Sequence, residues 1–403
     1  MMTKYKRVLA ILSLLILQLT LFAQEDSLRY RAYSQYQNQL VEPAITTLKI
    51  LLEYNKQDVY TNSFLATCYL KHGQLSEARY YALKAEKYRK GSGQLVLARV
   101  ATAVDSFDKA MMHLEALRKS RYHCHYHQLI TDDYLLPLTY SETWDRACQN
   151  GFFASYEFTF HRILQALDEQ KYGEALGWSR DLQIEYPREH YAWFLEALVL
   201  QAMDKPGDAL KKLEQALGTY GAVAEYQALK VQLCISLQQP AEGLSALRRY
   251  RHYAPFDAEN LLWEAKLKNL GNDSEKALEA LAAYLELFPN SHKAQRLQVQ
   301  LMKDAGKSLA ALRSVNSLMR EGKPDASLYQ LRGELYLETR SYKFAEKDFS
   351  MALDLTPRKA SLWLQKGNAR WLQGNAEGAC TDWQWARHYG SKEAVKKILE
   401  HCQ

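Results

Sequence analysis

A short run of histidines around one cysteine has the residue types that metal chemistry needs. His123, Cys124, His125 and His127 fall within five consecutive positions, and His113 lies ten residues earlier. Imidazole and thiolate groups are ligands for zinc and copper. The spacing is neither C-x₂-C nor H-x₃-H, and the histidines share one side only if the segment is extended. We therefore predict no metal and no other cofactor, and keep His123, Cys124, His125 and His127 as the alternative ligand set.

Sequence motifs of the common enzyme classes are absent. The chain has no Gly-rich phosphate loop and no H-E-x-x-H, G-x-S-x-G or C-x-x-C sequence. Acidic pairs such as Asp132 and Asp133 have no partner base at an informative spacing, and are typical of solvated turns. We predict that the protein is not an enzyme.

The first 23 residues have the layout of a secretion signal. Lys4, Lys6 and Arg7 precede an apolar run, which ends in the small residue Ala23. The run is shorter than the ~20 residues that a membrane-spanning helix needs, and no later stretch is suitable. We expect cleavage of residues 1–23, no transmembrane segment afterwards, and an exported protein that is periplasmic or associated with the outer envelope.

The charge of the remaining chain is small. Without those three cations, the formal net charge falls from +6 to +3 over the other 380 residues of the 403. Nucleic-acid binding requires a concentrated basic face, so we predict no nucleic-acid partner.

Small residues recur every 34 positions over much of the chain. The series is Ala175, Ala209, Gly243, Ala277, Ala311, Ala345 and Ala379. Each 34-residue unit contains two apolar patterns of helical period separated by a turn, and in several units a proline such as Pro357 ends the second pattern. Small residues let two helices approach closely. The period therefore predicts an all-α chain built from helix pairs.

This pattern resembles that of the tetratricopeptide repeat family, a 34-residue helix–turn–helix unit. The matching residues in one unit are Tyr329, Gly333, Tyr336, Ala345, Phe349, Ala352 and Pro357. The resemblance implies an α-solenoid in two blocks in an exported bacterial protein. We predict an N-terminal block of about three repeats at 24–120, a capping insert and hinge at 121–155, seven repeats at 156–393, and a capping helix at 394–403.

The resemblance also implies a binding groove, because the first helix of each unit lines the concave side in this family. The family positions fall first on aromatic or apolar residues, then on polar or basic ones: Phe160, Leu164, Tyr191 and Phe194, then Lys266, Asn269, Lys293, Arg296 and Lys303. We expect a non-catalytic exported scaffold that binds a partner protein or an extended peptide there. The alternatives are a structural subunit of an envelope assembly, secretion or cell-wall complex, and a metal-binding function at the histidine run.

Export makes disulfide bonds expected among the six cysteines. Cys380 lies about ten residues before a turn at Gly390 and Cys402 about twelve after it, so two antiparallel helices bring them to similar heights. We predict a Cys380–Cys402 bond that fixes the final helix. Cys124 and Cys148 are a second candidate pair, and the two remaining cysteines are expected to be buried thiols.

Overall fold

The computed structural model describes residues 24–220, 223–322 and 324–402. Within these ranges all regular secondary structure is helical, which confirms the predicted fold class. The predicted signal segment, with Lys4, Lys6 and Arg7, lies outside the described residues. No described helix combines the length and the apolar character that crossing a membrane requires.

The chain forms two compact units, which divide between Trp263 and Glu264. The division falls inside helix α16 (Glu259–Leu270). The predicted insert at 121–155 lies within the first unit, so these units do not coincide with the two blocks expected from the sequence.

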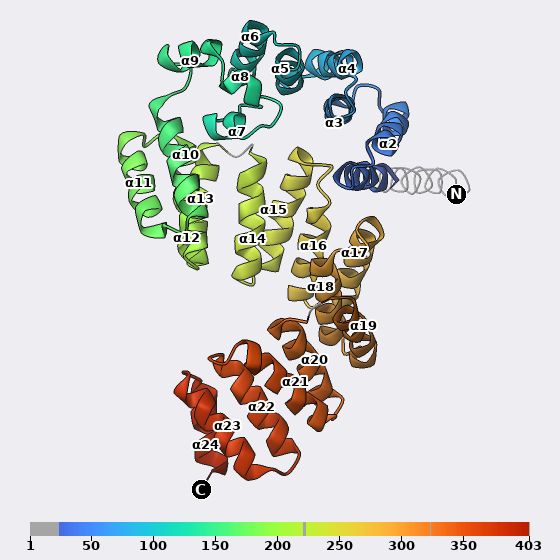
Figure 1. Ribbon diagram of the computed structural model, residues 1–403, viewed down its shortest axis with the longest axis vertical. Helices are drawn as coiled ribbons and strands as arrows, with labels where there is room; N and C mark the ends of the chain where they lie inside the picture. The colour runs from blue at the N-terminus through green and yellow to red at the C-terminus, as the bar shows by residue number, and fades with distance from the viewer. Residues whose placement is uncertain (1–23, 221–222, 323, 403) are drawn as a thin grey trace, which may run out of the picture. The chain divides into compact units, whose positions relative to one another are not determined.

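The first unit is a succession of helices in which chain neighbours pack as antiparallel pairs (Figure 1). Three short helices, α7 to α9, interrupt the succession. A helix over residues 24–37 is followed by α2 (Val41–Tyr54), α3 (Val59–Lys71), α4 (Leu75–Tyr88), α5 (Gln94–Thr102), α6 (Phe107–Arg118), α7 (Tyr126–Ile130), α8 (Leu136–Thr139), α9 (Glu142–Gln149), α10 (Ser155–Asp168), α11 (Tyr172–Glu185), α12 (His190–Ala202), α13 (Pro206–Thr219), α14 (Ala224–Ser236) and α15 (Pro240–Tyr253).

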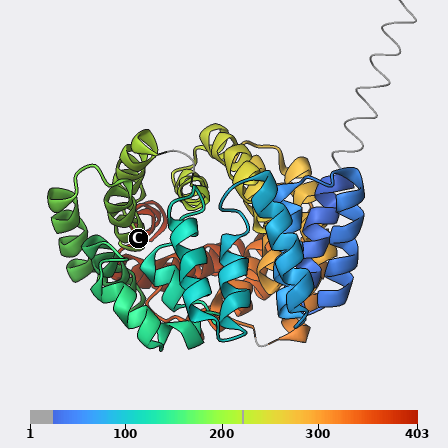
Figure 2. The ribbon, with the colours of Figure 1, turned by 90° about the horizontal axis from the view of Figure 1, so that it is seen from above.

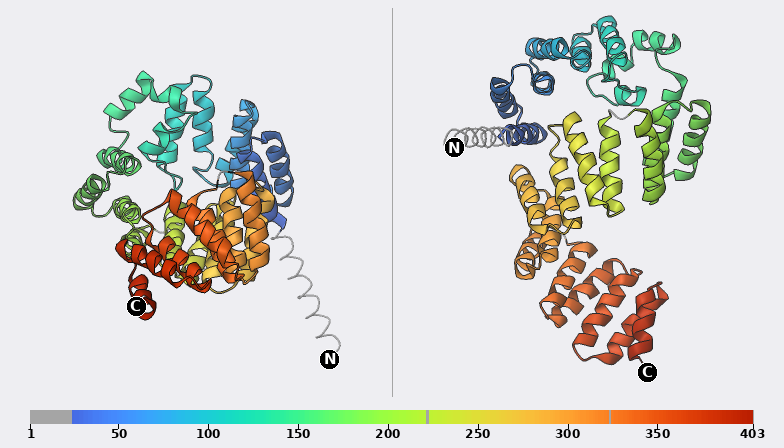
Figure 3. Two further views of the ribbon diagram at one scale, coloured as in Figure 1. Left: turned by 60° about the horizontal axis from the view of Figure 1, so that its bottom comes forward. Right: turned by 180° about the vertical axis from the view of Figure 1, so that it is seen from behind.

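The second unit continues the same pairing, which Figures 2 and 3 show from further directions. Its helices after α16 are α17 (Ser274–Leu287), α18 (His292–Asp304), α19 (Ser308–Glu321), α20 (Ala326–Glu338), α21 (Tyr342–Leu355), α22 (Ala360–Leu372), α23 (Ala376–His388) and α24 (Lys392–His401). Helices α18, α20 and α22 begin at 292, 326 and 360, so the 34-residue period is the period of the helix pairs.

The turn inside each pair repeats a backbone conformation rather than a residue type. One residue has a positive φ, between 56° and 86°, at Gln170, Asp204, Gln238, Asn272, Gly306, Arg340 and Gly374. These positions also follow the 34-residue step. A left-handed conformation costs a residue other than glycine roughly 1–2 kcal/mol, and glycine occupies only two of the seven positions. Helix packing on both sides of the turn must therefore impose this conformation.

Small residues at the recurrent positions let paired helices approach closely. Ala175, Ala311 and Ala379 are fully buried. Gly367 in α22 shows the tightest fit, because a Cβ atom there would lie 2.6 Å from the buried ring of Trp383 in α23. The recurrence of small residues thus reflects the distance between helices, as the sequence predicted.

Contacts between distant parts of the chain connect the two ends of the first unit. The hydroxyl of Tyr30 donates to Asn260 Oδ1 at 3.0 Å, across 230 residues of sequence. The ring of Phe64 in α3 lies 4.9 Å from that of Phe256, which follows α15. The beginning of the described chain lies beside the start of α16 (Figure 1). The succession of helices in this unit therefore closes on itself.

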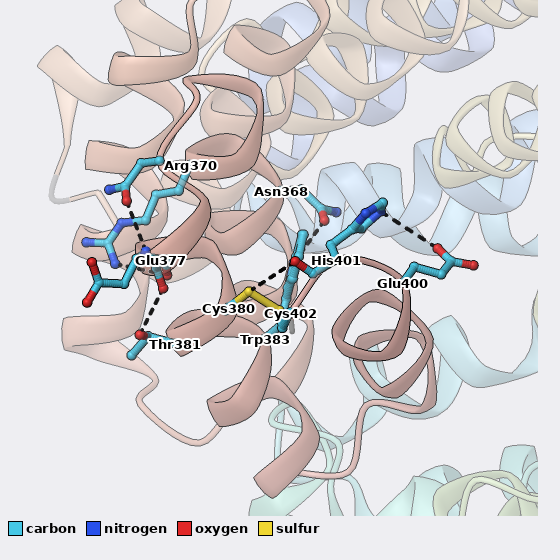
Figure 4. The surroundings of a disulfide bond; sticks show 11 residues. Asn368, Arg370, Glu377, Cys380, Thr381, Trp383, Glu400, His401 and Cys402 are labelled. Atoms are coloured by element: carbon cyan, nitrogen blue, oxygen red, sulfur yellow. Dashed lines mark hydrogen bonds and ion pairs between the residues drawn. A yellow bond between two sulfur atoms is a disulfide. The ribbon is translucent and has the colours of Figure 1, made fainter.

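A disulfide bond between Cys380 and Cys402 holds the final helix against α23 (Figure 4). The two Cα atoms are 5.7 Å apart. Helix α24 covers the last apolar cluster, which contains the fully buried Trp383 and Ala394. The sequence predicted this pairing, and it also predicted a capping helix at 394–403, where α24 lies.

The other cysteines carry free thiols. The candidate pair Cys124–Cys148 is therefore wrong. Each of these thiols instead packs separately against the apolar cluster around Trp144. Cys68 and Cys234 are buried, as expected.

Candidate functional site: a ring-lined cavity in the first unit

A cavity of about 560 Å³ lies among the helices of the first unit. Its size is within the range of small-molecule pockets. The walls come from several separate segments of the chain between α3 and α15. Aromatic rings form much of the lining: Tyr60, Tyr122, Tyr156, Phe160, Tyr191, Phe194, Tyr220 and Tyr253.

A buried carboxylate connects three helices that contribute residues to this cavity. Glu157 lies in the first turn of α10, where an acidic side chain can accept from the free N–H groups of the helix start. Its oxygens accept from the backbone N–H of Ala154 at 3.2 Å and of Tyr126, the first residue of α7, at 3.0 Å. The guanidinium of Arg118, at the end of α6, donates to both oxygens at 2.8 and 3.1 Å. Glu157 thus fixes α6, α7 and α10 relative to one another.

His125 presents unused hydrogen-bonding groups to the cavity. Its side chain is 2% exposed, and its ring centroid lies 3.7 Å from that of Tyr191 and 5.0 Å from that of Phe160. Neither ring nitrogen has a hydrogen-bond partner among the described residues. Burial, followed by the nearby charges of other histidines and Arg118, lowers the pKa of His125 to about 3. The neutral ring therefore offers one donor and one acceptor without a partner.

The neighbouring histidines already have hydrogen-bond partners. His123 Nδ1 lies 3.1 Å from the backbone oxygen of Arg118, and His190 Nδ1 lies 2.6 Å from the hydroxyl of Tyr226. Both residues border the cavity, and burial lowers the pKa of His190. Unlike His123 and His190, His125 has no hydrogen-bond partner on either nitrogen, although its Nδ1 lies 3.8 Å from Glu157 Oε2.

The alternative metal-ligand set needs correction. The donor atoms that come together belong to His123, His125 and Glu157, all within 4.8 Å, whereas Cys124 and His127 do not join them. His127 faces His161 instead, with 2.9 Å between their Nδ1 atoms.

The donor chemistry of this corrected set does not favour a metal ion. Both Glu157 oxygens are engaged by the Arg118 guanidinium, which a cation would have to displace. Burial raises the pKa of Cys124 to about 12, so this thiol stays protonated and is a poor ligand. We therefore interpret the group as an ion pair beside two histidines.

The predicted groove residues of the first unit have separate environments. Phe160, Tyr191 and Phe194 line the cavity. Leu164 packs instead against the buried cluster that contains Ile163. Three of the groove positions that the family resemblance implied thus lie in the aromatic wall of the cavity. His125, which precedes the short helix α7, was not among those positions.

In the predicted basic stretch of the second unit, two of the cations form ion pairs. Arg296 donates to Asp325 at 2.7 Å, and Lys303 forms an ion pair with Glu334. Asn269 donates to Asp304 at 2.7 Å. Lys266 and Lys293 also have interaction partners. Arg296 and Glu334 border a hollow of about 370 Å³, so this surface carries carboxylates beside its cations.

Comparison with known proteins gives a structural likeness only. No protein-family model and no curated protein matches the sequence. A tetratricopeptide repeat protein from Parabacteroides merdae aligns with 62% of this chain and 98% of its own, at 20% identity and a TM-score of 0.53. Yeast Tom70 aligns over 93% of each chain at 13% identity, with a TM-score of 0.42. MamA from Desulfovibrio magneticus aligns with 41% of this chain and 94% of its own, at 19% identity and a TM-score of 0.37.

Proposed function

Because the chain folds as a solenoid of tetratricopeptide repeats, we propose that it is a non-catalytic scaffold that binds an extended segment of a partner protein in the cavity of its first unit. Solenoids of stacked repeats form extended concave surfaces that suit this task. His125 is the observation that carries the proposal. A buried polar group without a partner costs about 1–3 kcal/mol, and a bound ligand would recover the lost hydrogen bonds.

The protonation states around the cavity support a binding role rather than catalysis. The low pKa of His125 leaves its ring neutral and a weak base at neutral pH. Burial, with the carboxylates of Glu157 and Glu189, raises the pKa of Tyr156 to about 12. Burial also raises the pKa of Cys124, so its thiol stays protonated and the nucleophilic thiolate does not form. A catalytic group instead requires a pKa near the working pH.

Export is part of the same proposal. The disulfide bond in the second unit is of a kind that persists in oxidising compartments. The pattern of residues 1–23 supports a periplasmic or envelope location. Fractionation of cells that make the native protein tests this part, and recovery in the cytoplasm would contradict it.

Site-specific photo-crosslinking tests the binding site. A benzophenone side chain at Tyr220, which borders the cavity and is 37% exposed, should crosslink to a partner in the native envelope. The same side chain at Tyr140, which is 85% exposed and outside the cavity, is the control. Crosslinking at Tyr140 but not at Tyr220 would place the partner elsewhere.

A further inference from the structure

The cavity of the first unit carries charges of both signs without ionic partners. Arg89 follows α4 and Arg121 follows α6, whereas Glu189 precedes α12 and Glu225 lies in α14. Within the described part of the chain, none of these four side chains forms an ion pair, although the partly buried Arg118 nearby does. Their charges are therefore available to a ligand.

The two cations lie on the same side of the cavity, around two tyrosines. Arg89 donates to the hydroxyl of Tyr122 at 3.3 Å, and its guanidinium lies 5.6 Å from the ring centroid of Tyr60. Arg121 is close enough to influence the same ring: burial raises the pKa of Tyr60, while Arg89 and Arg121 oppose the rise. Both arginines also border the adjacent hollow beside α4.

The two carboxylates come from other elements of the lining, since Glu189 precedes α12 and Glu225 lies in α14. The pKa of Tyr226 is raised by burial first, and then by Tyr191, Glu225 and Glu189. Burial and Glu225 likewise raise the pKa of Tyr191. The side of the cavity formed by α12 and α14 is thus acidic, whereas the side formed after α4 and α6 is basic.

In chain order, His125 lies between the residues of the basic side and those of the acidic side. It precedes α7, after the basic side and before the acidic one. Its unpartnered donor and acceptor match a hydroxyl group, which can both donate and accept. Its ring neighbours, Phe160 and Tyr191, favour an aromatic ligand, because aromatic rings attract one another in tilted and offset arrangements.

We infer that the cavity recognises a peptide segment with an acidic residue on one side of a tyrosine and a basic residue on the other. This inference rests on the proposed function and specifies the chemistry of the peptide that the cavity binds. The acidic residue would face Arg89 and Arg121, the basic residue would face Glu189 and Glu225, and the tyrosine hydroxyl would meet His125. A segment with one sign of charge would meet repulsion on one side, so charge complementarity also sets the orientation. The acidic side would likewise repel a polyanion such as a nucleic acid.

Selection from a phage-displayed library of random dodecapeptides tests this inference on the full chain. Parallel selections use the wild-type protein and the variants Arg121→Glu and Glu225→Lys, whose substituted residues are exposed. Lys109→Glu and Glu185→Lys are matched controls, since both residues are exposed in the first unit and lie outside the cavity. Thermal unfolding of each variant checks that the fold is kept.

The expected wild-type consensus has a tyrosine between an acidic and a basic residue. Arg121→Glu should select against the acidic residue and Glu225→Lys against the basic one, while the controls should keep the consensus. Replacing either charged residue of a synthetic consensus peptide by glutamine should weaken binding roughly five- to tenfold in fluorescence anisotropy.

The inference would be overturned by a consensus that carries one sign of charge or none. It would also be overturned by a consensus that both cavity variants retain. Either result would leave peptide binding intact. Failure to enrich any sequence on the wild-type protein would overturn both the inference and the proposed function.

Discussion

The guanidinium of Arg118 lies against the fully buried carboxylate of Glu157, with 2.8 Å between Nη1 and Oε1. The pair connects the end of α6 to the first turn of α10, and Arg118 borders the cavity. The carboxylate also accepts the backbone N–H of Tyr126 at the start of α7. The position of His125, one residue earlier, therefore depends on this ion pair.

Removing one partner of this pair should destabilise the first unit strongly. Arg118→Ala leaves the Glu157 carboxylate buried without its cation, and breaking a buried pair in this way typically costs about 3–5 kcal/mol. Lys119→Ala is the control, because the neighbouring Lys119–Glu115 pair is exposed and should change stability little. Urea unfolding of the two variants measures the difference. Equal stability would show that the buried pair does not hold these helices.

Replacing His125 by leucine should stabilise the protein and weaken peptide binding. The substitution removes two buried nitrogens that have no partner in the described structure, and leucine is apolar and of similar size. Binding would lose the hydrogen bonds that the imidazole offers. A higher melting temperature together with a lower affinity would show that His125 acts in binding and not in stabilising the fold. A loss of both melting temperature and affinity would contradict this binding role.

His125 should also make the first unit sensitive to acid. Its pKa of about 3 in the folded chain lies below the ordinary value of 6.5, so the unfolded chain binds more protons between these two values. The free energy of unfolding should therefore fall as the pH drops through this window, by at most about 1.4 kcal/mol per pH unit from this group. His125→Leu should reduce that slope in urea unfolding at several pH values. An unchanged slope would assign the acid sensitivity to other groups.

Adding a methyl group at Gly367 should destabilise the second unit. The new Cβ atom would lie 2.6 Å from the Trp383 ring, and overpacking of this kind costs about 1–3 kcal/mol. Gly177→Ala is the control, because its Cβ atom in α11 would meet nothing within 4 Å and should stabilise the helix. Thermal unfolding should show shifts of opposite sign. A destabilised Gly177→Ala would indicate that the helix propensity argument fails here.

Reducing the disulfide bond should loosen the final helix. The bond closes a loop across 22 residues, for which chain entropy predicts a stabilisation of about 3 kcal/mol. The double variant Cys380→Ser/Cys402→Ser should unfold at a lower temperature and no longer respond to reductant. Cys148→Ser, which removes a free thiol, should keep the response of the wild type. A wild-type protein that is insensitive to reductant would contradict the role of the bond.

Features that depend on local contacts were predictable from the sequence, whereas features built by distant segments were not. Small residues at a fixed step predicted the helix pairs, and the spacing around Gly390 predicted the Cys380–Cys402 bond, because both depend on neighbouring helices. The cavity has no such signal, since its walls come from several separate segments of the first unit. The contact of Phe64 with Phe256 likewise joins positions with no sequence pattern in common.

Charge pairing between successive repeats was not foreseen for the second unit. Lys303 pairs with Glu334, which lies 31 residues further along the chain, and Arg296 with Asp325, 29 residues further. Each cation therefore finds its carboxylate in the following repeat, so single helices look basic when they are considered alone. Searching for opposite charges about one period away would have detected these pairs.

Isothermal titration of one library-selected peptide tests the central claim most directly, because it compares the two candidate surfaces. The cavity variant is Arg121→Glu, and the variant of the second unit is the double reversal Lys293→Glu/Arg296→Glu. We predict that Arg121→Glu weakens binding roughly tenfold or more, whereas the double reversal leaves the affinity nearly unchanged. Loss of binding in the double reversal together with full affinity in Arg121→Glu would contradict the assignment of the site to the first unit.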